Sequence, residues 1–366
     1  NVLSRYSVSR KFDILNFYGK IIKRIAPSSY IVLLFTFILT FVFIPSPFWL
    51  ETIKEIVYSS LHLENYRLIQ LAVDYLSDGI PSSPVQQFWA LSVQIQFYFI
   101  LPVVVVISLF VSRLMNSLKP LIFICILVLI FSFSFSVYAT YQNPSTAYFN
   151  TFARIWEFFS GVLLAILSPY IKNNDIADKY STSYGYFGFI FIIFGGLIIP
   201  EFLKFPGFIA IGPVISACLV IVSGFFIKKS NLRNILSSRL LVFIGSMSFT
   251  IYLWHWPILV FYKHHANTSE IGLVVGLSII FISIFLSYLT TTYIENPIRR
   301  IKFNKAISNY ALGAALFSIV FISSLFSLKF IENLTLERID YLKNNLENVH
   351  NEIGRASCRE RVCHRV

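Results

Sequence analysis

The sequence predicts an all-α, polytopic membrane protein: a bundle of about nine transmembrane helices. Two observations lead to this fold class. Hydrophobic residues make up 56% of the 366 residues and charged residues only 13%, whereas soluble domains contain about 45–50% apolar and about 25% charged residues. The apolar residues also gather into runs near the ~20 residues that a helix needs to cross a bilayer.

Nine apolar runs can be placed along the chain. They are residues 28–45, 97–112, 120–139, 153–171, 185–200, 208–227, 240–262, 271–292 and 308–328. Basic residues lie between these runs, which is typical of cytoplasmic loops, and no basic stretch interleaves with aromatic residues as in a nucleic-acid-binding module. The formal net charge of +12 therefore indicates membrane orientation, and the expected partner is the lipid bilayer and no nucleic acid.

The distribution of charge orients the predicted spans. The segment before the first run carries six basic residues and is expected in the cytoplasm by the positive-inside rule. Alternation then places loops 113–119, 172–184, 228–239 and 293–307 in the cytoplasm, and the residues after 328 outside. Segment 46–96, with two basic against five acidic residues, falls outside, where we expect short amphipathic helices at the membrane interface.

The stretch GSMSFTIYLWHWPILVFY (245–262) carries an ionisable ring inside an apolar run. At helical spacing Ser248, Tyr252 and His255 share one face, and Pro257 predicts a kink because it lacks an N–H and crowds the preceding turn. An intramembrane histidine is a candidate functional residue. The alternative, a ring satisfied by a neighbouring carbonyl, stays open.

The stretch SPVQQFWALSVQIQFYFILP (83–102) brings three amides into a predicted helix. Gln87, Gln94 and Tyr98 fall on one helical stripe, and Trp89 and Gln96 on another. Buried amides need hydrogen-bond partners, so these residues either line a polar cavity or join neighbouring helices.

The stretch YFNTFARIWEFFSGVLLAI (148–166) contains a potential ion pair. Arg154 and Glu157 are three residues apart, which is close enough for pairing on a helix. A buried ion pair contributes little net stability, and this favours a functional site over the alternative of an interfacial salt bridge.

The stretch YIENPIRRIKF (293–303) lies at the predicted cytoplasmic end of a span. Asn296-Pro297 is expected to end the helix there. Arg299 and Arg300 either anchor the membrane surface, which positive-inside charge favours, or hold the phosphates of a nucleotide-like donor.

In this order, the four stretches resemble the acyltransferase 3 family of bacterial membrane O-acyltransferases. QFWALSVQIQFYFILP resembles its tryptophan-glutamine-tyrosine segment, ARIWEFFSGVLLA its Arg-x-Trp-Glu segment, and FIGSMSFTIYLWHWPILVF with YIENPIRR its final pair. FYGKIIKRIAP resembles the basic run before the family's third span. The resemblance covers residues from about 12 to 305.

The resemblance implies a bacterial inner-membrane enzyme that transfers an acyl group, usually acetyl, from cytoplasmic acyl-CoA to a sugar of an envelope polysaccharide. The acceptor is expected to be that polysaccharide or a lipid-linked sugar, with no bound cofactor and no metal. The expected catalytic residues are Arg154, Glu157 and His255. The expected substrate-binding residues are Trp89, Gln94, Gln96, Tyr98, Tyr252, Arg299 and Arg300.

The chain departs from the family pattern at three places. The family's presumed general base is a histidine of its first span, which this chain does not contain. Gln87 stands where the family often has histidine, and Gln94 where it often has glutamate. Glutamine forms hydrogen bonds but does not exchange protons near neutral pH, so neither position can act as a base.

Three parts are expected along the chain. Residues 1–305 form the acyltransferase 3-like membrane domain without its first spans, and residues 306–351 an additional span with the start of an extracytoplasmic linker, as in members fused to an SGNH-type domain. Residues 352–366 include EIGRASCRERV, the translation of a common sequencing adapter, and are expected to be foreign to the protein. We therefore expect the natural protein to continue beyond both ends, and a fragment lacking the base to be inactive.

Two other classes of protein share these features. A carrier or flippase for lipid-linked sugars is one, but transporters often have related halves with interrupted helices, and no paired halves are visible here. A non-catalytic membrane scaffold is the other. A histidine in a preceding span would favour the enzyme.

The orientation can be tested by cysteine labelling in intact cells. Cysteines introduced in segment 46–96 should react with an impermeant thiol reagent, because that segment is expected outside. Cysteines introduced in loop 228–239 should react only after the membrane is opened. The reverse pattern would contradict the predicted orientation.

Overall fold

The computed structural model describes residues 13–73, 83–115, 117, 119–198, 204–226, 231–268, 270–301 and 306–363. Every regular element in these residues is a helix, which confirms the all-α fold class. The long helices are α2 (Ile14–Phe43), α5 (Phe88–Leu114), α6 (Lys119–Gln142), α8 (Thr151–Lys172), α9 (Asp175–Ile198), α10 (Ile211–Phe226), α13 (Ser248–Ala266), α14 (Leu273–Thr290) and α16 (Ala306–Cys363). The shorter ones are η1 (Ser46–Phe48), α3 (Trp49–Ser60), α4 (Glu64–Val73), α7 (Pro144–Phe149), η2 (Gly207–Ala210), α11 (Asn231–Leu236), α12 (Arg239–Ser246), the π-helix η3 (Thr291–Glu295) and α15 (Asn296–Arg300).

Seven helical segments of the described residues are long and apolar enough to cross a membrane, and the bent pair α12–α13 makes an eighth if it is one span. The protein is thus a multi-span membrane protein, with slightly fewer candidate spans than the nine runs of the sequence. The run 185–200 accounts for the difference. It lies in α9, which is not among the candidates, and residues 199–200 fall outside the described part of the chain.

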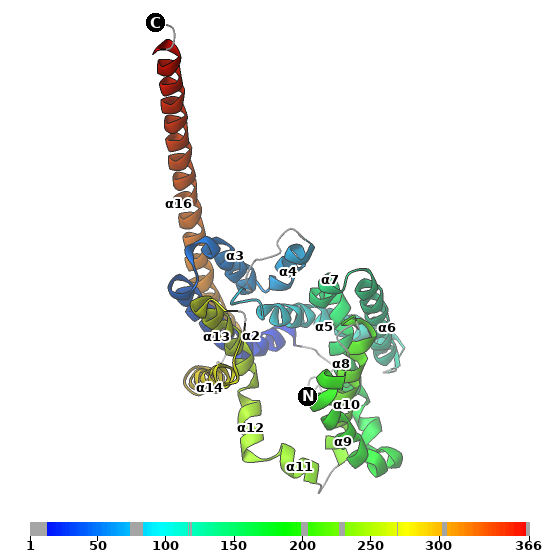
Figure 1. Ribbon diagram of the computed structural model, residues 1–366. Helices are drawn as coiled ribbons and strands as arrows, with labels where there is room; N and C mark the ends of the chain where they lie inside the picture. Colours follow the sequence, from blue (N-terminus) through cyan, green and yellow to red (C-terminus); the bar gives the residue numbers. More distant parts are fainter. Residues whose placement is uncertain are drawn as a thin grey trace.

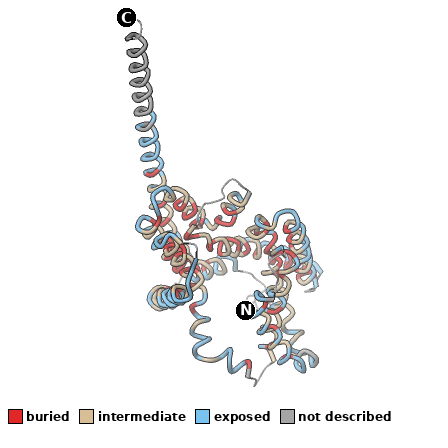
Figure 2. The backbone as a smooth tube through the Cα atoms, in the orientation of Figure 1, coloured by how far each residue is buried: buried red, intermediate tan, exposed pale blue. Residues whose placement is uncertain are grey.

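The helices form two groups that meet along α5 (Figure 1). In one group α2 packs against α3, α13 and α16; in the other α6 packs against α8, and α9 against α10. The first turns of α5 contribute Phe88 and Leu91 to the core of the first group, whereas Phe97 belongs to the core shared with α6 and α8. Buried residues follow α5, while α12 and residues 332–339 of α16 are largely exposed (Figure 2).

The segment after α2 returns along that helix. Trp49 at the start of α3 packs on Phe41 near the end of α2, with ring centroids 5.1 Å apart. At the other end of α3, the Tyr30 hydroxyl donates to the Ser60 carbonyl at 3.1 Å. The expected short helices are therefore present as α3 and α4, and the turn between them lies beside the middle of α2. Their position at the membrane interface stays a prediction.

Helix α13 continues through Pro257 without a break, and the kink predicted there stays a prediction. A sharp bend of 65° lies between α12 and α13, at Met247. A proline leaves the carbonyl four residues earlier without its helical donor, and here that carbonyl belongs to Leu253. The Gln87 side chain supplies the missing donor, with Nε2 at 3.0 Å from the Leu253 oxygen, so this carbonyl is hydrogen-bonded despite the proline.

Two carboxyl groups are buried between α3 and α4. Glu55 is 5% exposed and Glu64 is fully buried, and the two side chains are hydrogen-bonded to each other. Burial raises the pKa of both carboxyls, and the charge of Glu55 raises the pKa of Glu64 further, well above its usual value. Two adjacent buried carboxyls cannot both be charged at low cost, so the pair holds a shared proton.

This pair predicts a loss of stability at high pH. The native state binds the Glu64 proton more tightly than the unfolded state does, so stability present at low pH is lost as pH rises through the raised pKa, by about 1.4 kcal/mol per pH unit at most. Glu64→Gln should remove this loss in thermal unfolding of the purified protein. Glu51→Gln is the control, because the pKa of Glu51 is lowered in the folded protein. An unchanged pH dependence in Glu64→Gln would contradict the shared proton.

Candidate functional site

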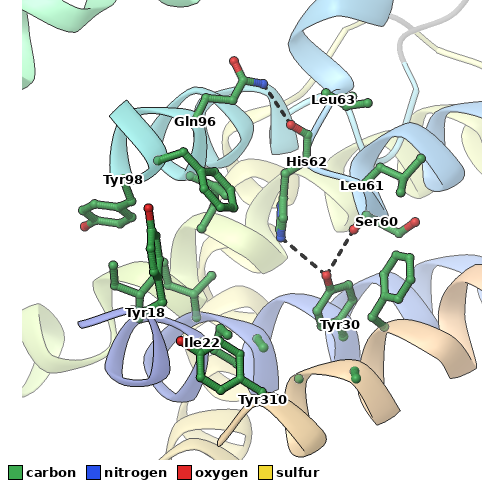
Figure 3. Close-up of a pocket in the computed structure, with 18 residues that line it drawn as sticks. Tyr18, Ile22, Tyr30, Ser60, Leu61, His62, Leu63, Gln96, Tyr98 and Tyr310 are labelled. Carbon is green, nitrogen blue, oxygen red and sulfur yellow. Dashed lines mark hydrogen bonds between the residues drawn. The ribbon is translucent and has the colours of Figure 1, made fainter. Parts of the chain in front are cut away.

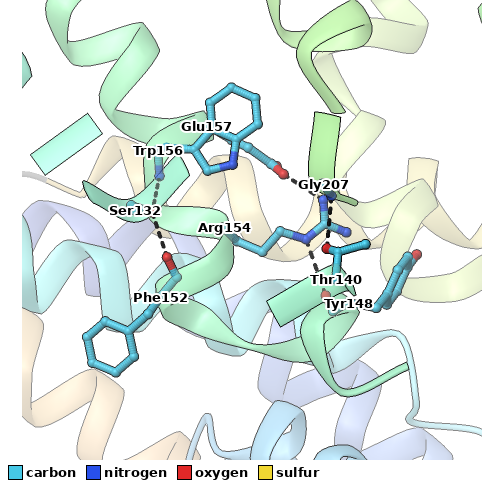
Figure 4. A network of polar contacts seen from close by, with 8 residues as sticks. All are labelled: Ser132, Thr140, Tyr148, Phe152, Arg154, Trp156, Glu157 and Gly207. Carbon is cyan, nitrogen blue, oxygen red and sulfur yellow. Dashed lines mark hydrogen bonds and ion pairs between the residues drawn. The ribbon is translucent and has the colours of Figure 1, made fainter. Parts of the chain in front are cut away.

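Arg154, in the first turn of α8, is surrounded by three aromatic rings, which are called the aromatic surround. Figure 4 shows its guanidinium between Glu157 and one of these rings, Tyr148. Its guanidinium carbon is 4.9 Å from the ring centroids of Tyr148 and Phe205 and 5.5 Å from that of Trp89. Arg154 Nη1 donates to Glu157 Oε1 at 2.6 Å, and Nε donates to the Tyr148 carbonyl at 3.2 Å. The predicted pair is confirmed, and the side chain of Arg154 is only 8% exposed while that of Glu157 is 25% exposed.

The start of α8 is held rigidly under this pair. The Asn150 side chain caps the helix by accepting from the N–H groups of Phe152 and Ala153. The Ser132 hydroxyl of α6 donates to the Phe152 carbonyl at 2.5 Å and accepts from the Trp156 N–H at 3.0 Å. α6 therefore determines where the first turn of α8, and with it Arg154, is placed.

The turn that carries Phe205 is hydrogen-bonded to α6, the helix that also positions the start of α8. The Gly207 N–H donates to the Thr140 hydroxyl at 3.0 Å. Gly207 has φ of +34°, a conformation that favours glycine, and a Cβ there would lie 3.3 Å from Thr140 Cγ2. α6 thus positions both sides of the aromatic surround.

Gln96 of α5 joins three helices through its amide. Its Nε2 donates to the His62 carbonyl and to Asn65 Oδ1, each at 2.9 Å. Its Oε1 accepts from the hydroxyl of Thr151, the first residue of α8, and Asn65 Nδ2 donates to the same hydroxyl at 3.0 Å. The network leads directly to the turn that carries Arg154.

His62 forms the turn between α3 and α4 and has φ of +56°, a left-handed conformation in which histidine is enriched relative to most residues. Its Nε2 lies 3.5 Å from the Tyr30 hydroxyl. Burial lowers the pKa of His62 to about 4, so the ring is neutral at pH 7. Neither His62 nor Asn65 was singled out from the sequence, because their roles depend on contacts with distant residues.

Gln87 and Tyr252 connect α5 to the helix that bears His255. The Tyr252 hydroxyl donates to the Gln87 carbonyl at 2.5 Å, and Trp256 Nε1 donates to the Ser83 carbonyl at 2.9 Å. Gln87 precedes by two residues the Trp89 ring that covers Arg154. The structure therefore places Trp89 against Arg154 and joins Tyr252 to Gln87, two residues before Trp89.

His255 uses one ring nitrogen within its own helix. Nδ1 lies 2.7 Å from the Tyr252 carbonyl and 3.3 Å from the Ile251 carbonyl. Since carbonyls only accept, Nδ1 carries the proton and Nε2 is left with a lone pair. The ring is half-buried and packs near Tyr252, with centroids 5.6 Å apart. Nδ1 is satisfied by a neighbouring carbonyl, which is one of the two interpretations of the sequence. The other interpretation, a functional histidine, would use Nε2, which can accept a proton.

Three predicted residues make other contacts. Gln94 Nε2 donates to the Tyr98 hydroxyl at 3.0 Å along α5, as their common stripe predicted. Arg299 donates to the buried Glu295 at 3.1 Å, and Glu295 also accepts from the Ser28 hydroxyl of α2 at 3.1 Å. Arg299 therefore contacts the α2 side of the bundle and is not brought together with Arg154, and Arg300 is exposed.

The expectation that Asn296-Pro297 ends a helix is wrong. Pro297 lies in the first turn of α15, which continues to Arg300. The preceding turn is the π-helix η3, a wider turn that often occurs at functional sites. Proline is tolerated at the start of a helix because its missing N–H has no helical partner there.

No group of three or more His, Cys, Asp or Glu side chains in the described residues could hold a metal ion. Cys125 and Cys218 are free. What the site offers is an arginine–glutamate pair, a histidine with a free lone pair, and amides and phenols between them.

The fold and the site define a polytopic helical membrane protein whose polar residues converge on one amide-rich helix. The chain belongs to the acyltransferase 3 family: the family's acyltransferase domain matches residues 2–292. This covers three of the four stretches on which the resemblance was based, whereas YIENPIRR (293–300) begins just after the matched region.

Curated relatives agree with this family. The chain is 26% identical over 310 residues to O-acetyltransferase OatA of Staphylococcus aureus, covering 82% of this chain and 50% of the relative. It is 27% identical over 314 residues to a Bacillus subtilis protein named "Putative peptidoglycan O-acetyltransferase YrhL", covering 81% and 48%. The chain thus spans about half the length of the curated relatives it matches. No solved structure matches it.

The ion pair predicts an asymmetric stability effect. Arg154→Met leaves the Glu157 carboxylate partly buried without its partner, and should lower the free energy of unfolding by about 3 kcal/mol. Arg154→Met combined with Glu157→Gln should recover part of that loss, as measured by thermal unfolding in detergent. Ser160→Ala is the control on the same helix, because its hydroxyl bonds only the Trp156 carbonyl. Additive losses in the double variant would contradict direct coupling.

Proposed function

We propose that this chain is the membrane part of a bacterial O-acetyltransferase, which moves an acetyl group from cytoplasmic acyl-CoA to a hydroxyl of an envelope polysaccharide or lipid-linked sugar. The observation that carries the proposal is the site around Arg154 and His255, within the region that matches the acyltransferase family. The names of the relatives, O-acetyltransferases, support acetyl as the group transferred.

The reaction needs a proton acceptor and donors to an oxyanion. The acceptor oxygen attacks the thioester carbonyl, a C–O bond forms, the C–S bond breaks, and the hydroxyl proton ends on the released thiol. His255 Nε2 has the free lone pair for a transient proton or for a bond to the sugar hydroxyl. Arg154, which keeps its charge in the pair with Glu157, is the proposed donor to the negatively charged oxygen.

The remaining predicted residues bind the substrates. Trp89 and Tyr252 line the acceptor side, with Gln96 and the Gln94–Tyr98 pair completing it. Arg299 and Arg300 face the donor, whose phosphates they hold at the cytoplasmic end of the bundle. In this orientation the start of the chain is cytoplasmic, the residues after 328 are extracytoplasmic, and the membrane is the bacterial plasma membrane.

The proposed function is tested by transfer of labelled acetyl. Membranes containing this chain, preceded by the first spans of a family member, should transfer radioactive acetyl from acetyl-CoA to envelope polysaccharide or lipid-linked sugar. Membranes without the protein are the control. Movement of lipid-linked sugar across the membrane without acetylation would favour a carrier instead.

His255 provides the sharpest variant in that assay. His255→Ala should lower the rate about ten- to hundredfold, because a polar contact worth about 1–3 kcal/mol in the transition state is lost. His255→Gln keeps hydrogen-bonding ability and should retain more activity. Normal rates in both variants would leave His255 as a packing residue only, whereas equal and complete loss with normal expression would indicate direct proton transfer.

A further inference from the structure

A cavity of about 600 Å³ lies between α2, α5, α16 and the α3–α4 turn (Figure 3). Its volume is in the range of small-molecule sites, about 300–1,000 Å³. The three helices that form its walls are all candidate membrane spans. Along α2 the lining extends from Tyr18 to Tyr30, which is about 18 Å at 1.5 Å per residue.

The walls of the cavity are almost entirely apolar. Representative lining residues are Ile25 of α2, Ile95 of α5, and Ala314 and Phe317 of α16. Phe99 and Leu61, which also line it, are 60% and 42% exposed. The cavity is therefore continuous with an apolar outer surface at the level of the spans, where hydrocarbon would surround the protein.

Polar groups of Ser60, His62, Gln96 and Tyr30 lie together at one end, which is called the polar end (Figure 3), and Tyr30 already donates to the Ser60 carbonyl. The phenols of Tyr18, Tyr98 and Tyr310 line the other side of the cavity. Gln96 links this end to Thr151, three residues before Arg154. The polar end of the cavity therefore borders the candidate site, while the rest of the cavity leads away from it.

This polarity selects the kind of ligand. The pantetheine arm of acyl-CoA carries two amides, which would lose their hydrogen bonds to water inside apolar walls at a cost of about 1–3 kcal/mol each. A hydrocarbon chain has no such cost, and each methylene that enters is stabilised. A free polysaccharide has no apolar part to place there.

We propose that this cavity holds the hydrocarbon chain of a lipid-linked sugar, with the sugar at the Gln96 end beside the Arg154 site. The role of that sugar as acetyl acceptor rests on the proposed function, but binding of the chain does not. A polyprenyl-phosphate sugar and a glycosyl diacylglycerol share this chemistry, and both are candidates for the ligand.

Photolabelling of the purified full chain in detergent tests the proposal without turnover. Three probes carry a diazirine in the chain: a glucosyl diacylglycerol, a polyprenyl-phosphate glucose, and a phosphocholine lipid with the same acyl chains. At least one sugar probe should label peptides of α2 or α16 that line the cavity more strongly than the phosphocholine probe does. The sugar probe that labels more strongly shows whether the hydrocarbon chain in the cavity belongs to a diacylglycerol or to a polyprenyl phosphate.

Neighbouring alanines on α16 provide matched variants. Ala314 lines the cavity, whereas Ala315, also exposed, does not. Ala314→Phe should reduce labelling about tenfold, the effect of excluding about two methylene groups, and Ala315→Phe should leave it unchanged. If Ala314→Phe does not purify as a folded protein, Ile95→Trp replaces it, with the exposed Val103→Trp as control.

Two results would overturn the proposal: undiminished labelling of the folded cavity variant, or equal labelling by the phosphocholine probe, which would show that no sugar is recognised. Sugar-selective labelling that depends on Ala314 supports it even if acetyl transfer is never observed. In that event only the proposed function fails.

Discussion

The hydrogen bond from Gln87 Nε2 to the Leu253 carbonyl is the contact on which the arrangement of the site depends. Pro257 removes the helical donor of that carbonyl, and an unpaired carbonyl at membrane depth is costly. A side chain of another helix repairs the defect, so α13 stays continuous past His255. The repair also brings the start of α5 against α13, where Tyr252 returns a second hydrogen bond to the Gln87 carbonyl.

A second amide of α5, that of Gln96, also joins this helix to its neighbours through hydrogen bonds. Gln96 pairs with the His62 carbonyl, Asn65 and Thr151, and so attaches α5 to the α3–α4 turn and to the start of α8. Apolar contact alone distinguishes poorly between helix registers in a membrane, because lipid tails are as apolar as leucine. The amides of Gln87, at the start of α5, and Gln96, within it, fix how α5 is aligned with the helices of the two groups that meet along it.

Charge is buried in two different ways in this protein. Arg154 keeps its charge because a carboxylate, a carbonyl and three aromatic rings surround it. Glu55 and Glu64 form no ion pair within the described residues, although the charge of Arg67 lowers the pKa of both, and the pair holds a proton instead. The first solution keeps a charge available beside the candidate site, whereas the second stabilises the turn that closes the polar end of the cavity.

Local pattern by itself determined the fold class, most of the spans, the Arg154–Glu157 pair and the Gln94–Tyr98 contact, because each depends on hydropathy or on residues one helical turn apart. It gave the wrong helix end at Pro297, and it did not show that the Leu253 carbonyl left by Pro257 has another donor. The effect of a proline depends on what else can satisfy the backbone. Only the tertiary structure decided that Gln87 supplies that partner, that α3 returns along α2, and that Phe205 and Tyr148 enclose Arg154. These contacts join residues far apart in the chain or on adjoining helices, and no local periodicity encodes which distant helix will meet a given face.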